Sequence, residues 1–492
     1  MWFDVFLLGF DLECLLVCLI VFVTVAGYLK NKNPPNYPPG PRPIPFIGSF
    51  LSMDYQSGDF TRLAKIYGNV FSMQLGCHKV VVLCGQKMMK EALLVHGEDF
   101  AYRGPTPIYK RVISENAGGF FCSNGEMSKR HRRFVLSTWR SWGKNVMEQN
   151  IREEIRNMRE EIEKENGEPF DTKGIINNAV FNIICQLLTG RRFEYSDHKF
   201  VSMVNIINEL IRMEGSIWAE LYDVFPQIMQ YLPGPHNMLF SLREKIYIFM
   251  REEVERHKRE LDPDNPRDYI DSFLIEMKNH TENDQGFNEK NLVLCCADLL
   301  AAGTETTATT LQWALVYLIK NPEVQEKVCA EIDNVIGQNR LPTMADRPNL
   351  PYTDAVIHEI QRLANIIPTG IRSLDKDTEI GGYFLPKGTA IMLCMTSVLF
   401  DKTAWETPYV FNPGHFLDAD GKFVKSDAHM VYSAGKRACL GEGLAKMEVF
   451  LFVVALFQKF SFSAPEGEEL KTEGVIGVTN APCNFKVHAK AR

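Results

Sequence analysis

The stretch YSAGKRACLGEG, residues 432–443, sets one cysteine, Cys439, between two glycines and just behind two basic residues. Gly435 and Gly441 permit turns with positive φ and the close approach of a flat ligand to the backbone. The two basic residues add positive charge beside the thiol. An isolated cysteine is usually a small buried hydrophobic residue, but this setting favours a thiolate that binds a ligand.

A strongly apolar segment follows this cysteine and predicts a helix that is buried on nearly all sides. Its hydrophobic residues recur at helical spacing: Leu444, Met447, Leu451 and Val454. Cys439 therefore lies just before the N-terminus of a helix, where free backbone N–H groups and the helix dipole stabilise a thiolate. These local features indicate a ligand-binding cysteine but leave the ligand open.

The composition is that of a folded protein with one large or two ordinary domains: 492 residues, 45% hydrophobic and 23% charged. The formal net charge of −7 gives no general reason to expect nucleic-acid binding. The 12 cysteines include no Cys-x-x-Cys pair, which argues against a zinc site and a disulfide scaffold. They are typical of reduced thiols in a protein that faces the cytosol.

The N-terminal segment, residues 1–30, predicts a signal-anchor transmembrane helix. Residues 14–29, CLLVCLIVFVTVAGYL, carry no charge and, with the apolar residues before them, approach the roughly 20 apolar residues that span a bilayer. Acidic residues precede this segment and Lys30, Lys32 and Arg42 follow it, which predicts a cytosolic location for the rest of the chain. A cleaved signal peptide is the alternative, but a positive n-region and a small-residue cleavage site are lacking.

The remaining chain predicts an extended proline-rich linker over residues 31–43 and one catalytic domain over residues 44–492. Hydrophobic residues at helical spacing predominate in this domain, in residues 147–164, 245–260, 288–318 and 354–364. Residues 70–84 and 378–394 each predict a β-hairpin. The expected fold is mainly α with small β-sheets.

The cysteine stretch resembles the haem-binding loop of the cytochrome P-450 superfamily, F-x-x-G-x-R-x-C-x-G, with Tyr432 in place of the phenylalanine. The resemblance implies the cytochrome P-450 fold, with Cys439 as the axial thiolate ligand of haem b and Arg437 as a partner of a haem propionate. The phrases FLPKGT, FNPGHFLD and GEGLAKMEVFLF are most similar to vertebrate microsomal family-two members.

A second stretch, LLAAGTETTATTLQW at residues 299–313, is similar to the family's oxygen-activation motif A-G-x-[DE]-T-[TS]. Glycine and consecutive threonines are poor helix formers, so one interpretation is a kink or a packing contact. The other is a groove for oxygen and water. The resemblance implies that Thr306 hydrogen-bonds there and that Glu305 helps to deliver protons.

Glu359 and Arg362 match the family's E-x-x-R motif. The spacing alone carries no information, because it recurs in exposed-looking helices at Glu153/Arg156, Glu209/Arg212 and Glu253/Arg256. Only the order along the chain, after the threonine motif and before FNPGHF, selects Glu359 and Arg362. The resemblance implies that this pair and His415, where arginine is frequent, support the cysteine loop.

The stretch NGEMSKRHRRF, residues 124–134, is similar to the family helix with the motif W-x-x-x-R. Arg132 matches the arginine that binds a haem propionate, whereas Ser128 replaces the tryptophan. Arg372 aligns with another propionate-binding position. The remaining basic side chains are an ordinary solvated face or, as we expect, a docking surface for an acidic redox partner: Lys129, Arg130, Arg133 and Lys436.

The resemblance implies a haem-thiolate monooxygenase that inserts one oxygen atom of O2 into lipophilic molecules such as xenobiotics, fatty acids or steroids. GEGLAK opens a helix rather than following a strand, so it is no NADPH-binding fingerprint, and electrons are expected from NADPH-cytochrome P-450 reductase, with cytochrome b5 as a further partner. The expected location is the endoplasmic reticulum membrane, with a single pass and contact with lipid. The expected substrate-pocket residues are Ala301, Ala302, Ile367, Ile371 and Val478.

Three alternatives are open at this point. A haem-thiolate isomerase or dehydratase would need no reductase. A non-catalytic haem sensor would bind carbon monoxide without consuming NADPH. A membrane-anchored helical scaffold would hold no haem at all.

Overall fold

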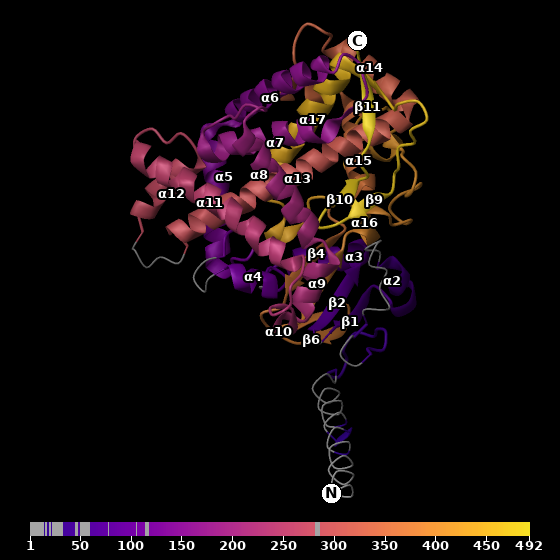
Figure 1. The fold of residues 1–492 in the computed structure, drawn as a ribbon. Helices are drawn as coiled ribbons and strands as arrows, with labels where there is room; N and C mark the ends of the chain where they lie inside the picture. The colour runs from indigo at the N-terminus through magenta and orange to yellow at the C-terminus, as the bar shows by residue number, and fades with distance from the viewer. Residues whose placement is uncertain are drawn as a thin grey trace, which may run out of the picture.

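The computed structural model describes residues 33–44, 48–49, 60–76, 78–104, 106–113, 118–280 and 286–492, together with Cys14, Val17, Cys18 and Val21. Helices make up most of this part, and the strands form small sheets (Figure 1). The expected anchor over residues 1–30 lies almost wholly outside the described residues. Within them, no helix is both long enough and apolar enough to cross a membrane.

The helices include both short connectors and long core elements. The α-helices are α2 Thr61–Tyr67, α3 Gly85–Lys90, α4 Pro107–Val112, α5 Gly125–Trp142, α6 Lys144–Lys164, α7 Thr172–Thr189, α8 His198–Glu214, α9 Ile217–Val224, α10 Pro226–Met229, α11 His236–Glu260, α12 Tyr269–Lys278, α13 Glu289–Lys320, α14 Pro322–Val335, α15 Pro351–Ala364, α16 Thr396–Leu399 and α17 Glu442–Lys459. Short π- and 3-10 turns are η2 Glu91–Val95, η3 Met344–Asn349, η4 Pro413–Phe416 and η5 Gly435–Arg437. The four helices expected from hydrophobic spacing are therefore confirmed as α6, α11, α13 and α15.

The strands belong to four small sheets in the described chain. They are β1 Val70–Leu75, β2 His78–Cys84, β3 Phe170–Asp171, β4 Thr369–Ser373, β5 Thr378–Ile380, β6 Tyr383–Leu385, β7 Ala390–Cys394, β8 Phe460–Ser463, β9 Gly474–Ile476, β10 Asn480–Pro482 and β11 Lys486–Ala491. The largest sheet has the order β1-β2-β7-β4, and the others are β10-β9, β3-β11-β8 and β5-β6.

The hairpin expected over residues 70–84 is confirmed as the antiparallel pair β1–β2. The expectation of one hairpin over residues 378–394 is wrong for its second half. β5 and β6 form the hairpin, while β7 leaves it to pair in parallel with β2 and antiparallel with β4. β7 is apolar along its whole length, with Ile391 and Leu393 fully buried, so a place between two other strands suits it better than a hairpin edge.

Helix α13 runs through the middle of the helical part and packs against α7, α8, α11, α15 and α17 (Figure 1). It is apolar on nearly all sides, as a helix in a core position must be. At Gly303 a Cβ atom would lie 2.6 Å from Cδ1 of Ile184 on α7. The glycine therefore allows α7 to approach closely, which is the packing role considered for it, and α13 continues as an α-helix past this point.

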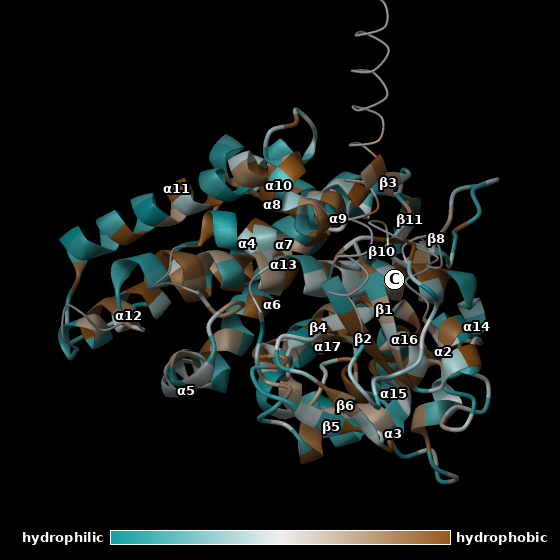
Figure 2. Cartoon of the chain, turned by 90° about the horizontal axis from the view of Figure 1, so that it is seen from below, coloured by the Kyte–Doolittle hydropathy of each residue, from teal (hydrophilic) through white to brown (hydrophobic). Residues whose placement is uncertain are grey.

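Helix α17, which follows Cys439, is also buried nearly all round, as its sequence predicts. By contrast, α11 carries alternating polar and apolar segments along its length (Figure 2) and buries only one face, including Leu239, Ile246 and Val254. The proline-rich segment lies against β1: the Ser72 hydroxyl donates to the carbonyl of Pro38 (2.8 Å) and the Ser72 N–H to that of Pro39 (2.7 Å).

Candidate functional site

The loop that carries Cys439 is held in a tight turn by its own backbone. The Cys439 N–H donates to the carbonyl of Tyr432 (2.9 Å), and the Ala438 N–H to that of Gly435 (3.1 Å). Gly435 has φ of 73°, and a Cβ atom there would lie 2.0 Å from the carbonyl oxygen of Leu93. Only glycine allows the loop to adopt this conformation while it packs against η2.

The Cys439 thiol is accessible although protein surrounds it. Burial raises the pKa of the Cys439 thiol, while a hydrogen bond from the backbone of Gly441 and the charge of Arg132 act in the opposite direction. Among the described cysteines after residue 21, Cys439 alone is exposed. Cys295, on α13, is fully buried, and burial raises its pKa well above the usual value. Cys439 is thus more open to a ligand than Cys122 and Cys483, which are half-buried, and than the buried thiols.

Four arginines gather around this loop from distant parts of the chain. Arg132 on α5 donates from Nη1 to the carbonyl of Ala438 (2.8 Å), next to the cysteine. Arg437 donates from Nε to the carbonyl of Ala101 (2.8 Å) and from Nη2 to Oδ1 of Asn124 (3.0 Å) and to the Ser123 carbonyl. Arg103 shares Asn124, since the Arg103 N–H donates to the same Oδ1 (2.8 Å).

The fourth arginine, Arg372 on β4, is buried and donates from Nη1 only to the carbonyl of Ile371 (2.8 Å). Its Nε and the Nε of Arg103 have no hydrogen-bond partner. In the described part of the chain, neither these two residues nor Arg132 and Arg437 form an ion pair with a carboxylate. Burial, together with the charges of Arg103 and Arg437, lowers the pKa of Arg372 to about 9.

Arg437 has the same unfavourable electrostatics. Burial and the charges of Arg103 and Arg132 lower its pKa to about 10. Buried cations are ordinarily paired, because an uncompensated buried charge is costly. Mutually repelling arginines beside an accessible cysteine fit a flat ligand that brings its own carboxylates. The two propionates of haem meet this requirement, so the residues present fit the group.

On α13, the Thr306 hydroxyl donates to the carbonyl of Ala302 (2.7 Å), four residues back in the same helix. Such back-bonding competes with regular helix geometry, yet the helix continues through this position. The Glu305 carboxylate instead faces two threonines, and its Oε1 accepts from Thr309 (3.2 Å) and from Thr479 (3.0 Å). The expected pair Glu305 and Thr306 are thus neighbours on α13 with separate hydrogen-bond partners.

The expected pocket residues come from three segments that hydrogen bonds join. Thr479, beside Val478, binds Glu305, and Asn480 reaches the segment before β4 through an N–H bond to the carbonyl of Ile366 (2.9 Å). In spite of their apolar side chains, Ile371 and Val478 are 55% and 41% exposed. Ala302 is likewise exposed, and Ala301 and Ile367 are half-buried. Part of the loop over residues 113–121 lies outside the described residues.

Glu359 and Arg362 form a fully buried, bidentate ion pair on α15, with N···O distances of 2.7 and 2.8 Å. Arg362 Nη1 also donates to the carbonyls of Leu399 (2.8 Å) and Pro408 (2.7 Å). His415 Nδ1 lies 3.2 Å from Glu359 Oε1. Of the four pairs with this spacing, this one thus ties α15 to the segment that precedes the cysteine loop.

The protonation of His415 follows from its partners. Nε2 accepts the N–H of Thr407 (3.2 Å), which assigns the ring proton to Nδ1, on the side of Glu359. His415 therefore donates from Nδ1 to the carboxylate of Glu359.

The hydroxyl of Tyr432 has a partner that the sequence does not reveal. Gln361, inside the E-x-x-R motif, donates from Nε2 to the Tyr432 hydroxyl (2.8 Å). Burial raises the pKa of Tyr432, so the hydroxyl stays protonated. This bond joins α15 directly to the start of the cysteine loop.

Asp298 on α13 connects the loop at residues 118–123 to the cysteine loop. Its Oδ2 accepts the N–H groups of Phe120 (2.8 Å) and Phe121 (3.0 Å), and Arg437 donates to the carbonyl of Phe120 (3.5 Å). Burial raises the pKa of Asp298 to about 6. Sequence reasoning missed Asp298 and Arg103. A lone acidic residue in the apolar run CCADLLAAG was the available signal for Asp298, whereas no motif marks Arg103.

The basic run on α5 divides between two sides of the helix. His131 is fully buried and hydrogen-bonds the carbonyl of Gly286 (2.7 Å), and Arg132 points to the cysteine loop. Arg133 is exposed. Lys129 is half-exposed and shares Glu98 with Lys436, at N···O distances of 4.0 and 3.1 Å.

The remaining basic residue of the run, Arg130, lies over the ring of Phe287, 5.0 Å from its centroid, and approaches Nδ1 of His280 (3.4 Å). Arg130 is therefore less open to a partner protein than Lys129, Arg133 and Lys436 are.

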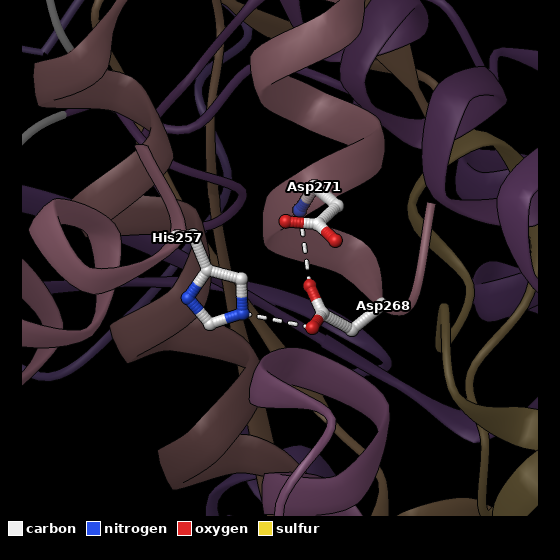
Figure 3. A group of neighbouring side chains, drawn as sticks. All are labelled: His257, Asp268 and Asp271. Atoms are coloured by element: carbon white, nitrogen blue, oxygen red, sulfur yellow. Dashed lines mark hydrogen bonds and ion pairs between the residues drawn. The ribbon is translucent and has the colours of Figure 1, made fainter. Parts of the chain in front are cut away.

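A second titratable cluster lies where α11 leads into α12 (Figure 3). His257 Nε2 is 2.8 Å from Asp268 Oδ2, and His257 Nδ1 is 2.6 Å from the carbonyl of Glu253. Burial alone would lower the pKa of His257, but the hydrogen bond and charge of Asp268 raise it. Asp271 binds Arg267 (2.7 Å). Both ring nitrogens of His257 and both carboxylates have hydrogen-bond partners within the protein. We therefore interpret the cluster as a buried ion pair between His257 and Asp268 and not as a metal site.

Comparison with known proteins agrees with this site. A model of the family described as Cytochrome P450 matches residues 38–489. The human protein Cytochrome P450 2J2 is 44% identical over 481 residues, covering 96% of this chain and 95% of that protein. Mouse Cytochrome P450 2J5 is 42% identical over 486 residues (98% and 96%), and human Cytochrome P450 2C8 is 41% identical over 481 residues (96% and 98%).

These matches extend over nearly all of the chain and agree with the exposed cysteine and the buried and half-buried arginines around it. The expected family is confirmed, and so is the helix-rich fold with small sheets. The chain belongs to the cytochrome P450 family, whose members are haem-containing monooxygenases.

Proposed function

We propose that this chain uses Cys439 as the thiolate ligand of haem b and inserts one oxygen atom of O2 into lipophilic small molecules. The single observation that carries the assignment is the set of one buried and three half-buried arginines beside Cys439, the one thiol described after residue 21 that is exposed: Arg372, with Arg103, Arg132 and Arg437. Bound haem supplies the oxygen chemistry, in which, as is general for cytochromes P450, a thiolate ligand favours O–O cleavage.

In this proposal the arginines hold the propionates. Arg372 and Arg103 offer the buried Nε–H groups that lack partners. Arg132 fixes the loop through the Ala438 carbonyl, so it contributes one hydrogen bond to the protein and its remaining N–H groups to the ligand. Ser128 is shorter than a tryptophan and has no indole N–H, so in this proposal the unpaired Nε–H of Arg103 acts as a donor in its place.

Glu305 and Thr306 handle protons in this proposal. The Thr306 hydroxyl can exchange its bond to the Ala302 carbonyl for one to a bound oxygen or water, because a hydroxyl rotates freely to a new acceptor. Glu305 lies one residue away and is held by Thr309 and Thr479. A carboxylate held in this way can pass protons through water to the helix groove.

We also propose that substrates are lipophilic, in the class of xenobiotics, fatty acids or steroids. The exposed apolar side chains of Ala302, Ile371 and Val478, with Ala301 and Ile367, support this class. Exposed apolar groups near a site favour apolar ligands. Substrates of this kind can reach the site from a membrane, which agrees with the proposed single-pass anchor in the endoplasmic reticulum and a cytosolic catalytic domain.

Electrons are proposed to come from NADPH through NADPH-cytochrome P450 reductase, with cytochrome b5 as a further partner. The exposed cations Lys129, Arg133 and Lys436 support docking of an acidic protein on the side of the cysteine loop. Because these charges are exposed, the interaction should weaken as the ionic strength rises.

A reconstituted assay tests this function. The purified chain, reductase and lipid are supplied with NADPH and a panel of lipids, steroids and drug-like compounds. The expected result is substrate-dependent NADPH consumption together with a product that carries one added oxygen atom. Rearrangement of a peroxide without NADPH would instead identify an isomerase or dehydratase, and a carbon monoxide spectrum without any turnover would identify a haem sensor.

A further inference from the structure

Thr307 differs from its neighbours on α13 in where its hydroxyl points. The hydroxyls of Thr304, Thr306 and Thr310 donate to carbonyls four residues back in the same helix, at distances of 2.7 to 2.8 Å. The Thr307 hydroxyl leaves its helix and donates to Oε2 of Glu448 on α17 (3.1 Å). This bond joins the helix of Thr306 to the helix that follows Cys439.

Glu448 is almost completely buried, with 1% of its surface exposed. Its other carboxyl oxygen, Oε1, has no hydrogen-bond partner. In the described chain, Thr307 is the polar group that contacts it, and no cation accompanies it. Burial raises the pKa of Glu448 to about 8, opposed only by the Thr307 hydrogen bond. An ionised carboxylate at this position would be a buried charge without compensation.

Charged and titratable groups of neighbouring elements contact α17, but they contact residues of this helix other than Glu448. The contacts are Arg159 of α6 with Ala455 and Gln458, Arg347 of η3 with Phe450, Cys329 of α14 with Phe457, Glu163 of α6 with Lys459, and Arg492 with Phe457 and Gln458. None of these groups offers Glu448 a counter-charge or a hydrogen bond.

We propose that Glu448 is a positioning residue: as a neutral carboxylic acid it pairs with Thr307 and holds α13 and α17 at a fixed separation. The inference rests on the proposed function, because it takes these helices as the two walls of the haem site. Thr307 adjoins Thr306, and Glu448 lies within the helix that begins three residues after Cys439. The pair therefore fixes the Thr306 hydroxyl relative to the cysteine loop.

The neutral acid makes the stability of the protein depend on pH. The ordinary glutamate pKa is 4.5, so an unfolded chain loses this proton well below pH 8, while the native chain keeps it until about pH 8. The stability contributed by Glu448 is therefore complete below about pH 4.5 and is lost progressively as the pH rises to 8. Between these values the contribution to the unfolding constant grows about tenfold per pH unit.

The first test compares the wild-type holoenzyme with E448Q, which keeps the acceptor but cannot ionise. An infrared difference spectrum at pH 7 should contain the band of a protonated carboxyl group in the wild type and not in E448Q. Because wild type loses stability over this range and glutamine does not titrate, the difference between the unfolding midpoints of E448Q and wild type should grow in favour of E448Q from pH 6 to pH 8. T304V serves as the control, since it removes a threonine hydroxyl of the same helix, and its midpoint should run parallel to that of wild type.

The second test measures positioning. T307V should raise, several-fold, the hydrogen peroxide released per NADPH consumed, because Thr306 is no longer held in register. T307S restores the hydroxyl and should restore the ratio, whereas T304V should leave it near the wild-type value. The inference would be overturned by a carboxylate band for Glu448 at pH 7, or by equal ratios in T307V and T304V. Each variant is first checked for the wild-type reduced carbon monoxide spectrum, so that failure of the inference is distinct from failure of the haem assignment.

Discussion

Arg362 and Arg372 are two buried arginines on either side of the turn that leads from α15 into β4, with 0% and 4% of their surfaces exposed. Arg362 has a bidentate carboxylate partner and two backbone carbonyls for the rest of its guanidinium. Arg372 has one carbonyl, an Nε without a partner and other arginines as its charged neighbours.

The difference in hydrogen-bond partners distinguishes an arginine that supports the fold from one that can bind a ligand. A buried cation whose hydrogen bonds are complete needs no ligand to compensate its charge, whereas one with missing partners is destabilising until an anion arrives. The complete contacts of Arg362 therefore fit its proposed role as a support of the cysteine loop. The missing partners of Arg372 fit its proposed role in binding the carboxylates of a ligand.

The largest effect is expected for Arg362→Ala. The change leaves the Glu359 carboxylate buried without its cation, and it removes the link to the carbonyls of Leu399 and Pro408. Breaking a buried ion pair costs about 3–5 kcal/mol, so we expect little folded holoenzyme. Thermal unfolding and haem content of the purified protein measure this. Normal yield and haem content would show that Arg362 does not support the cysteine loop.

A smaller and different effect is expected for Arg372→Leu. Removing a cation that lacks a counter-ion should leave the apoprotein at least as stable as wild type, while haem dissociates about ten- to a hundredfold faster, since a hydrogen bond to a charged group is worth about 1.5–3 kcal/mol. Transfer of haem to excess apomyoglobin gives the rate. Arg372→Lys keeps the charge, so its rate of haem dissociation should lie between those of wild type and Arg372→Leu. A less stable apoprotein with unchanged haem release would reverse the distinction between Arg362 and Arg372.

The smallest effect is expected for Arg212→Ala on α8. Arg212 pairs with Glu209 at the same spacing as Glu359 and Arg362 but is 69% exposed. Exposed pairs of this kind contribute about 0.2–1 kcal/mol, so the melting temperature should change by about one degree or less and haem content should remain normal. A loss as large as that of Arg362→Ala would mean that spacing, and not burial, makes the motif important.

The parts of the fold predicted correctly from the sequence are those whose signal is local, as with the four core helices that follow from hydrophobic spacing. The family also follows from local motifs in a fixed order, and these motifs select the cysteine loop, the threonine helix and the E-x-x-R pair as the proposed site. A local signal was also present for the division of the basic run on α5: His131, Val135 and Thr138 recur at helical spacing and are all buried. The dense positive charge concealed that periodicity.

The missed features depend on contacts between distant segments. Arg103 joins the site because its loop meets Asn124 of α5, and Gln361 matters because α15 meets Tyr432. The pairing of β7 was mispredicted for the same reason. β7 pairs with β2, which lies far away in the chain, and not with the neighbouring β6. A single sequence without structure provides no measure of such contacts.

The most direct test of Cys439 as the haem ligand is the reduced carbon monoxide difference spectrum of three proteins: wild type, Cys439→Ala and Cys295→Ala. We expect the thiolate-type band in wild type and in Cys295→Ala, which loses only a sulfur buried within the core, and loss of the band in Cys439→Ala. A thiolate-type band that persists in Cys439→Ala would contradict the assignment of the ligand, and its disappearance in Cys295→Ala alone would transfer that assignment to α13.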